Sequence, residues 1–416
     1  MTLFVAHDVT RLLRRYAVPS PNGIDRIDIA YAGHFITRSP TAHGGVYLHG
    51  LEPRLLSRTT LAALLSAMEE HWTEEGSSAQ SQYARVRERL LGQAGPKATA
   101  ALRSPPFSRL SPLRLLRPHG LISALFERIP DDAVFIHATH FPAARLFRWL
   151  RRRPDVKPVF FVHDLLPLQF PEYFAPTHIA EHQRSLEICA RYARAVIVNT
   201  HAVENAMAVF LRRHGRPGLP MLVRPMPPDP VFLGAPDAGL ADAPYFVVCG
   251  TIEPRKNHLL LLHVWRELAR QSGKRTPKLV VIGRRGWENE NVVDLLDRSH
   301  ELREHVIEAD ALPSAAVARL LAGARALLMP SFAEGYGLPI VEASAMGTPV
   351  IASDIPVFRE IAPGATFRGP LDGPGWLAAV QAHAEAASPS AIRELHRIRD
   401  PRADYFAAVE SFIAAL

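Results

Sequence analysis

Two glutamates stand eight positions apart in a glycine-rich segment, Ser331-Phe-Ala-Glu-Gly-Tyr-Gly-Leu-Pro-Ile-Val-Glu342. The apolar run 326–331 before it predicts a buried strand. Gly335 and Gly337 allow the backbone to approach a ligand closely, and Pro339 favours the first turn of a helix. The segment therefore predicts a strand, a glycine loop and a helix N-terminus, an arrangement that offers backbone N–H groups to a phosphate.

The two carboxylates, Glu334 and Glu342, suit a sugar beside such a phosphate. An ionised carboxylate only accepts hydrogen bonds, and sugar hydroxyls donate them. Each glutamate alone has an ordinary explanation, since Glu342 is a favourable charge near a helix N-terminus and Glu334 a solvated loop residue. In this glycine-proline context we expect the pair to be functional.

This segment resembles the Glu-x7-Glu motif of retaining glycosyltransferases of the GT-B fold, family 4 type. The resemblance implies an α/β protein with two doubly wound, Rossmann-like domains facing a cleft. It also implies a nucleotide-diphosphate sugar as co-substrate, transfer with retention at the anomeric carbon, and no metal or other cofactor. By resemblance, Glu334 contacts the donor sugar and Glu342 the nucleotide ribose. The loop residues assigned to substrate binding are Gly335, Tyr336, Gly337 and Leu338.

A second candidate site follows the predicted strand 245–249, in Gly250-Thr-Ile-Glu-Pro-Arg-Lys-Asn-His258. A departing sugar leaves negative charge on a diphosphate, and fixed cations stabilise that charge. Arg255 can bind phosphate through two N–H groups, whereas Lys256 acts as a compact charge. Adjacent basic residues are common on surfaces, but this run resembles the diphosphate-binding loop of the family. The resemblance assigns Arg255 and Lys256 to catalysis and Gly250 and Thr251 to substrate binding.

In the first half of the chain, His163 and Asp164 end the predicted strand 158–163. A histidine at a strand end is usually structural or solvated. This one resembles the His-Asp-Leu segment of the family, which implies that His163 lies beside the donor sugar. Asp164 and Glu172 are further candidates.

Three shorter loops add substrate-binding candidates. Asn22-Gly-Ile-Asp-Arg26 resembles the family's glycine loop in part, with one glycine where two are frequent, so Gly23 and Arg26 are candidates. Gly283 and Arg284, in Gly-Arg-Arg-Gly-Trp, resemble the family's loop near the nucleotide base. An ordinary turn with exposed arginines could have the same sequence. Asp310 precedes a predicted helix over 315–322 and is expected close to that loop.

Apolar runs alternate with helical patterns in both halves, which is typical of parallel strands joined by helices. The predicted strands are 3–6, 133–137, 158–163 and 195–199, then 245–249, 278–282, 326–329 and 349–352. Residues 51–130 show no clear strand signal. Six prolines in 225–244 indicate a linker. The predicted domains are therefore 1–224 on the acceptor side and 245–403 for the nucleotide sugar, with helix 404–416 packing back on the first.

Composition narrows the function classes. The 416 residues are 48% hydrophobic and 21% charged, as in globular proteins. We find no secretory signal and no apolar run near the roughly 20 residues that span a bilayer, and we expect a cytoplasmic enzyme with reduced Cys189 and Cys249. The net charge of +7 favours an acidic partner. Segment 97–126, with five Lys or Arg and no acid, is either an ordinary basic surface or a peripheral contact with the inner face of the plasma membrane. No nucleic-acid-binding motif is present.

The motifs together look most like bacterial mannosyltransferases of polysaccharide assembly. We therefore expect a GDP-mannose donor, with UDP-sugars as the alternative, and a glycan or lipid-linked saccharide acceptor. A GT-B nucleotide-sugar epimerase and a non-catalytic nucleotide- or membrane-binding scaffold remain open. A dinucleotide dehydrogenase is a poor alternative, because Ile340 stands where the third glycine of its motif would fall and the segment lies far along the chain.

Overall fold

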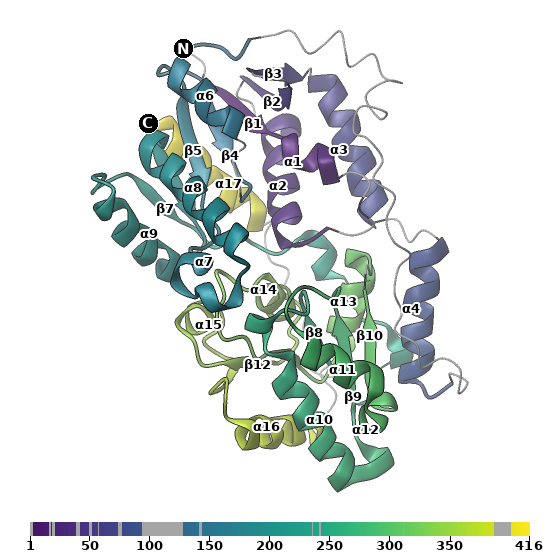
Figure 1. Ribbon diagram of the computed structural model, residues 1–416. Helices are drawn as coiled ribbons and strands as arrows, with labels where there is room; N and C mark the ends of the chain where they lie inside the picture. The colour runs from purple at the N-terminus through teal and green to yellow at the C-terminus, as the bar shows by residue number, and fades with distance from the viewer. Residues whose placement is uncertain are drawn as a thin grey trace. The chain divides into compact units, whose positions relative to one another are not determined.

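The computed structural model describes residues 3–15, 18, 21–38, 42–49, 52–56, 58–73, 77–93, 128–140, 144–234, 236–240, 243–310, 312–386 and 401–416 (Figure 1). The chain divides into two compact units. Unit 1 comprises Met1–Trp72, Phe107–Pro227 and Ile398–Leu416, and unit 2 comprises Thr73–Pro106 and Pro228–Arg397.

The described residues of unit 1 form a seven-stranded sheet in the order β3-β2-β1-β4-β5-β6-β7. Its strands are β1 Phe4–Asp8, β2 Ala42–His49, β3 Glu52–Leu56, β4 Val134–His137, β5 Lys157–Phe161, β6 Ala195–Val198 and β7 Met221–Val223. All neighbouring pairs are parallel except β2 and β3, which are antiparallel. The order reverses between β1 and β4, so ligands are expected beyond the carboxyl ends of these two strands.

Helices connect these strands. They are α1 Thr10–Arg15, α2 Gly23–Gly33, the π-helix η1 His34–Arg38, α3 Arg58–Thr73, α6 Ala144–Arg152, α7 Leu166–Gln169, η2 Pro171–Tyr173, α8 Pro176–Tyr192, α9 His201–Arg213 and α17 Pro401–Ala414. β4 and β6 are buried along their whole length. Helices on both faces of a parallel sheet produce such continuous apolar strands.

Unit 2 contains a six-stranded, fully parallel sheet in the order β10-β9-β8-β11-β12-β13 among its described residues. Its strands are β8 Tyr245–Cys249, β9 Lys278–Ile282, β10 Val306–Ala309, β11 Leu327–Met329, β12 Val350–Ser353 and β13 Thr366–Arg368. The order reverses between β8 and β11. Both units are therefore doubly wound α/β domains, as the sequence predicts.

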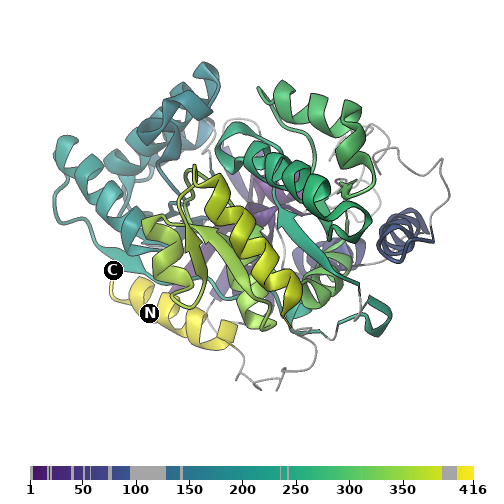
Figure 2. The same cartoon turned by 90° about the horizontal axis from the view of Figure 1, so that it is seen from below.

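The helices of unit 2 begin with α4 Ser77–Leu90, from the first half of the chain. The others are η3 Pro230–Leu233, η4 Ala238–Leu240, η5 Pro254–Lys256, α10 His258–Ser272, η6 Gly273–Arg275, α11 Glu290–Arg298, α12 His300–Arg303, α13 Ser314–Gly323, α14 Leu338–Ala345, α15 Pro356–Ile361 and α16 Gly373–Glu385. Figure 2 shows α10 and α16 lying next to each other over the sheet. Their fully buried Trp265 and Trp376 belong to one core with Phe246 of β8.

The apolar pattern of the sequence did not predict several strands. β2 carries Gly44 and Gly45, and β3 is an antiparallel edge strand containing Pro53 and Arg54. β7 and β13 are three-residue edge strands that are only half-buried. β10 is buried but includes Glu308, whose charge breaks the apolar run. β3, β7, β10 and β13 are edge strands with a neighbouring strand on one side only, and their apolar signal in the sequence is weaker than that of the central strands.

The predicted first domain, 1–224, is wrong for helix α4, which belongs to unit 2. Tyr83 donates a hydrogen bond of 2.6 Å to Asp237, and Arg87 donates one of 3.1 Å to the same carboxylate. Arg89 donates to the carbonyl of Val306 at 3.1 Å, on the edge strand β10. These contacts hold α4 to an edge of the second sheet.

Helix α17 belongs to unit 1 although it follows unit 2 in the chain. The Tyr405 and Tyr31 hydroxyls are 2.7 Å apart, and His34 Nε2 lies 3.0 Å from a carboxylate oxygen of Glu410. The Phe406 ring stacks on His34 with centroids 4.1 Å apart. Aromatic burial thus attaches the end of the chain to α2.

A substitution of Gly283 tests the close packing at the junction between β8 and β9. A Cβ atom at this position would lie 1.9 Å from the carbonyl oxygen of Gly250, a backbone atom that cannot rotate away. We expect Gly283→Ala to lower the free energy of unfolding by about 2 kcal/mol or more, which corresponds to a fall of several degrees in Tm. Gly364→Ala is the control because its Cβ would meet no atom within 4 Å. Equal melting temperatures for both variants in a thermal unfolding scan would contradict this packing.

Candidate functional site

Two loops of unit 2 meet at the carboxyl ends of β8 and β11, where the strand order reverses. The backbone N–H of Phe332 donates to the carbonyl of Arg255 at 2.8 Å. The side-chain amide of Asn257 donates to the carbonyl of Pro330 at 3.1 Å. Asn257 has a positive φ of 55°, a conformation that asparagine tolerates better than most residues. These bonds fix the loop after β8 against the loop after β11.

Glu334 lies at the centre of this junction. Its Oε2 accepts a hydrogen bond of 2.7 Å from Arg255 Nη1, and its Oε1 accepts one of 2.5 Å from Lys256 Nζ. The Ser331 hydroxyl donates to Oε1 at 2.8 Å. Glu334 is only 8% exposed. The structure thus brings the three predicted residues Glu334, Arg255 and Lys256 into direct contact.

The pKa of the Glu334 carboxyl reflects this setting. Burial raises the pKa, but the charges of Arg255 and Lys256 and the hydrogen bonds from Lys256 and Ser331 outweigh burial and lower it to about 2. Glu334 is therefore ionised at neutral pH and neutralises part of the charge of the two cations. The alternative that Glu334 is an ordinary solvated loop residue is therefore wrong.

Glu253 is a further member of this cluster that the sequence reading missed. Its Oε1 lies 2.7 Å from Arg255 Nε, and its side chain is buried. Lys256 lies over the end of β8, because a Cβ atom on Gly250 would meet Lys256 Cε at 3.3 Å. Gly250 also has a φ of 146°, a conformation that side chains rarely allow. A glycine is thus required beneath the lysine.

The second glutamate of the motif lies on α14. Glu342 is the fifth residue of this helix and only 2% exposed. Gly337 precedes the helix with a φ of 105°, and a Cβ there would approach Phe358 at 3.0 Å. Gly335 and Tyr336 are buried in the same loop, and Leu338 is half-buried at the start of the helix. The strand, glycine loop and helix predicted for this segment are confirmed.

The loop after β9 runs beside the loop after β8. The Ile252 N–H donates to the Arg284 carbonyl at 3.0 Å, and Gly286 N–H donates to the Ile252 carbonyl at 2.9 Å. Arg284 is exposed, and Thr251 is half-buried. Asp310 follows β10, the next strand, so these candidates all stand at carboxyl ends of neighbouring strands. The adjacent Arg285 is instead paired with Glu308 and Asp297.

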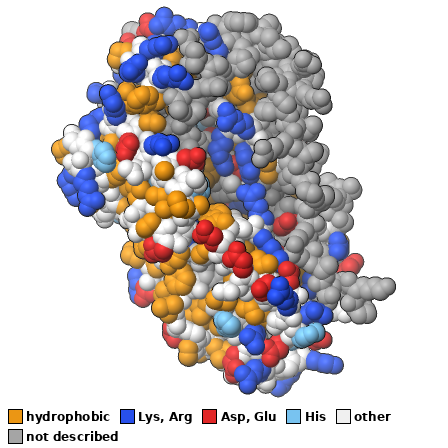
Figure 3. All heavy atoms as spheres, in the orientation of Figure 1, with side chains coloured by type: hydrophobic (Ala, Val, Ile, Leu, Met, Phe, Trp, Pro, Cys, Tyr) orange, Lys and Arg blue, Asp and Glu red, His pale blue; other side chains and the backbone are white. Residues whose placement is uncertain are grey.

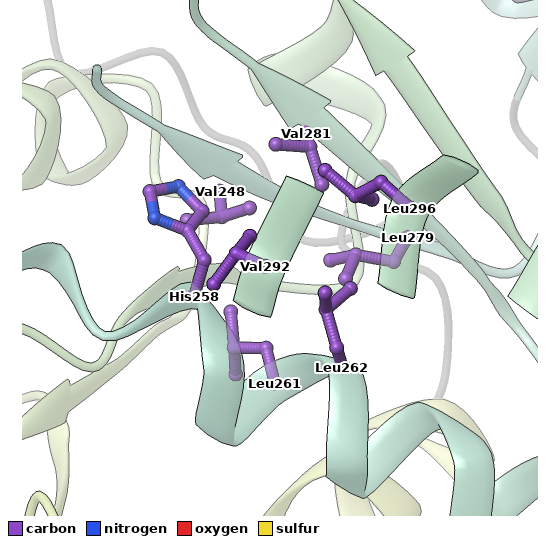
Figure 4. Close-up of a pocket in the computed structure, with 8 residues that line it drawn as sticks. All are labelled: Val248, His258, Leu261, Leu262, Leu279, Val281, Val292 and Leu296. Atoms are coloured by element: carbon purple, nitrogen blue, oxygen red, sulfur yellow. The ribbon is translucent and has the colours of Figure 1, made fainter. Parts of the chain in front are cut away.

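His258 begins α10 directly after this loop and points into the core (Figure 4). It lines a small cavity together with apolar side chains of β8, β9, α10 and α11: Val248, Leu261, Leu262, Leu279, Val281, Val292 and Leu296. Burial, and then the charge of Lys256, lowers the pKa of His258 to about 3. The ring is therefore neutral at physiological pH. It packs in the hydrophobic core and is not placed for acid-base chemistry.

The remaining predicted residues lie in unit 1. His163 is buried just beyond β5, and its Nε2 donates to the carbonyl of Ala138 at 2.9 Å. Burial, and then the charge of His140, lowers the pKa of His163 to about 3. The expected glycine loop at Gly23 is instead the start of helix α2, which also contains Arg26. Asn22 and Asp25 each accept a hydrogen bond from the other's backbone N–H at 2.9 Å, a capping box that starts a helix here.

The second unit matches a known family. Residues 237–388 match the family described as Glycosyl transferases group 1. This region is a glycosyl transferases group 1 domain. It contains the cluster of Glu253, Arg255, Lys256 and Glu334 described above.

The chain also matches curated proteins over part of its length. The chain is 33% identical over 225 residues to the serotype-specific mannosyltransferase WbdA of Escherichia coli, covering 49% of this chain and 26% of that protein. It is 37% identical over 140 residues to the O-antigen chain mannosyltransferase B of Escherichia coli, covering 33% of this chain and 35% of that protein. The chain thus spans about a quarter to a third of the length of these relatives.

Solved structures of other proteins share the whole fold. A structure of Anabaena HepE in complex with UDP and glucose matches over 100% of both chains, with a TM-score of 0.61 and 15% sequence identity. At this identity the likeness concerns the fold alone. The two Rossmann-like units are those of the GT-B fold, as the sequence predicts.

The ion cluster generates a prediction about stability and pH. The pKa of Glu334 is lower in the folded state than the ordinary 4.5, so its stabilising effect is present above pH 4.5 and is lost as the pH falls toward about 2. We expect this contribution to be on the order of 3 kcal/mol. Glu334→Gln should therefore lower stability at pH 7 and flatten the loss of stability on acidification. Denaturant unfolding from pH 7 to pH 3 measures this, with Glu385→Gln on the exposed face of α16 as control. Parallel curves for wild type and Glu334→Gln would contradict the assignment.

Proposed function

We propose that the chain is a retaining glycosyltransferase. It transfers a sugar, mannose from GDP-mannose in the first instance, from a nucleotide-diphosphate sugar to a glycan or lipid-linked saccharide in cell-surface polysaccharide synthesis. The observation that carries the proposal is the Arg255–Lys256–Glu334 cluster at the strand reversal of the group 1 domain. The mannosyltransferase names of the matching relatives support mannose as the sugar.

The cations of the cluster suit the leaving group. When the bond between the anomeric carbon and the diphosphate oxygen breaks, its electron pair stays on the diphosphate. Arg255 and Lys256 are already fixed in place by Glu334, so they stabilise this charge without rearranging. An ammonium group has three N–H donors, and Glu334 takes one of them in the described structure. This role of the cations is why the proposal includes no metal cofactor.

Glu334 itself suits a hydroxyl of the donor sugar. A carboxylate offers about four lone-pair positions. In the described residues three donors occupy them, from Arg255, Lys256 and Ser331. The remaining position lies on Oε2 and can accept a hydrogen bond from a sugar hydroxyl. Glu342, buried in α14, is proposed to contact the nucleotide ribose.

Contact with an anionic membrane is part of the proposal. The predicted segment 97–126 lies outside the described residues. Within the described part of the chain, α6 exposes Arg148, Arg151 and Arg152, and Figure 3 shows basic side chains gathered over this region. Such a basic helix surface attracts acidic headgroups. No helix among the described residues is long and apolar enough to span a bilayer.

Removal of one cation tests the mechanism. We expect Lys256→Ala to lower turnover at least tenfold, because the leaving diphosphate loses a fixed charge, and Glu334→Ala to do the same. The measurement is transfer of labelled mannose from GDP-mannose to octyl α-mannoside, with circular dichroism to confirm folding. Lys274→Ala is the matched control, since Lys274 is exposed at the other end of α10. An unchanged rate in Lys256→Ala would remove this residue from the mechanism.

A panel of nucleotides tests the donor. A ligand at a hundred times its Kd stabilises by about 2.7 kcal/mol, which raises Tm by roughly 5–10 °C at about 2–4 °C per kcal/mol. We expect this shift with GDP and GDP-mannose. The same shift with UDP or UDP-sugars would change the donor and keep the enzyme class. If GDP, UDP, ADP and dTDP all leave Tm unchanged, the proposed function is wrong. Product analysis would reveal an epimerase, which releases free nucleotide and an altered sugar.

A further inference from the structure

A buried aspartate in unit 1 holds two arginines just beyond the carboxyl end of β1. Asp25, the third residue of α2, is fully buried, and its carboxylate accepts hydrogen bonds from Arg15 Nε at 3.0 Å and from Arg15 Nη2 at 2.7 Å. Arg11 Nη1 donates to the same carboxylate. Both arginines lie on α1, which begins two residues after β1 ends. The order of the first sheet reverses between β1 and β4, and a doubly wound domain binds its ligand at this end of such strands.

The cluster holds more positive charge than its carboxylate needs. Arg15 alone pairs Asp25, because a guanidinium that donates two N–H groups to one carboxylate already forms a strong ion pair. Arg11 adds a second cation, so the three side chains sum to +1. Arg11 also stands in the first turn of α1, where the helix dipole disfavours a cation. Neutralisation of Asp25 therefore accounts for one arginine and not for the other.

Two further aspartates lie near this end of the sheet, and both have histidine partners. His137 Nδ1 lies 2.9 Å from Asp8 Oδ2, and His7 Nε2 lies 2.9 Å from Asp28 Oδ1. All four side chains are buried. Burial raises the pKa of Asp28 in spite of the bond to His7 and the charge of Arg11. Asp28 therefore opposes the excess positive charge less than an ordinary carboxylate does.

Both arginines keep donors that a ligand can reach. The side chain of Arg11 is 26% exposed and that of Arg15 is 19% exposed, whereas the Asp25 carboxylate is 0% exposed. A guanidinium has five N–H donors. Within the described part of the chain, Arg11 uses one of them and Arg15 uses two. The remaining N–H groups can meet an anion, and Asp25 fixes the two guanidiniums that carry them.

The charge of Arg11 also reaches a predicted site residue of the same unit. Burial and then the charge of His140 lower the pKa of His163, and the charge of Arg11 lowers it further. The effect of one charge on another falls with distance, so Arg11 stands close to His163 at this end of the first sheet. The arginine pair therefore belongs to the part of unit 1 in which a ligand is expected.

We propose that Arg11 and Arg15 bind a phosphate of the acceptor, which is then a saccharide carried on a phosphate or diphosphate ester. The inference rests on the proposed glycosyl transfer, in which unit 1 takes the acceptor. Guanidinium groups match the geometry of phosphate oxygens. The donor diphosphate has cations of its own in unit 2, Arg255 and Lys256. A neutral glycan leaves the extra charge of Arg11 without a counterpart, so the cluster favours a lipid-linked saccharide over a free glycan.

The experiment compares two acceptors that differ in charge. Mannose transfer is measured from GDP-mannose, or from the donor that stabilises the protein in the nucleotide panel, to octyl α-mannoside and to octyl α-mannosyl diphosphate. We expect the kcat/KM of wild type to be at least about tenfold higher for the diphosphate, because hydrogen bonds to a charged group form with that acceptor alone. Arg15→Gln and Arg11→Gln should each lower the ratio of the two kcat/KM values about tenfold. Arg14→Gln is the matched control, since Arg14 is exposed on the same helix, and it should leave the ratio unchanged.

A second measurement needs no turnover. With the donor site filled by a saturating concentration of GDP, octyl diphosphate at a hundred times its Kd should raise the Tm of wild type by a further 5–10 °C, roughly. Arg14→Gln should show the same shift, and Arg15→Lys, which keeps the charge, should show most of it. Arg15→Gln should show little. Each shift is measured from the variant's own Tm with GDP alone, so a loss of stability in a variant does not affect the comparison.

The outcomes separate this inference from the proposed function. If wild type transfers mannose equally well to both acceptors and octyl diphosphate leaves Tm unchanged, the phosphate site is wrong and the proposed function stands. If Arg15→Gln instead raises the KM for GDP-mannose and reduces the shift in Tm with GDP, the arginines serve the donor diphosphate and the inference is overturned. If Arg15→Gln lowers only the Tm of the unliganded protein, the cluster is structural and the inference is also overturned. If wild type transfers no sugar from any donor, the proposed function itself fails.

Discussion

The ion cluster around Glu334 is the interaction on which the second unit's site depends. One buried carboxylate contacts two cations that come from a different loop, and it thereby ties the carboxyl ends of β8 and β11 together. A buried ion deprived of its partners is strongly destabilising, by about 3–5 kcal/mol where one member of a buried pair is removed. The cluster therefore stabilises this arrangement of the two loops. In that arrangement Arg255 and Lys256 stand at the strand reversal of the second sheet.

The sequence predicted those parts of the fold in which physical signals were strong. Central strands such as β8 are apolar on both faces and were found by their continuous apolar runs. The edge strand β3 was missed because Pro53 and Arg54 interrupt its pattern. Helix α4 was placed in the wrong domain for a different reason. Its position depends on the bonds of Tyr83 to Asp237 and of Arg89 to Val306, more than 150 residues away, and no local pattern encodes such pairings.

The same distinction holds for the site. Glu334, Arg255 and Lys256 stand in short motifs that name their chemistry, and the structure brings them together. Glu253 was missed although it belongs to the same run, because a lone carboxylate beside a proline carries no signal until its distance to Arg255 is known. The position of His137 in the sequence could have marked it as a candidate. It ends a predicted strand of the first half, as His163 does, but only the bond to Asp8 distinguishes it from an ordinary buried histidine.

The charge balance of the cluster bears on how it would hold a diphosphate. Glu253 and Glu334 carry two negative charges and Arg255 and Lys256 two positive ones, so the four side chains sum to zero. Under the proposed function, affinity for phosphate would then come from directed N–H donors at short range, not from a long-range positive field. Such a neutral site attracts a distant anion only weakly, but it would hold an anion firmly where the N–H donors point at it. In the proposed transfer, charge on the diphosphate would grow as the sugar leaves, and the same fixed donors would then stabilise the transition state more than the bound donor.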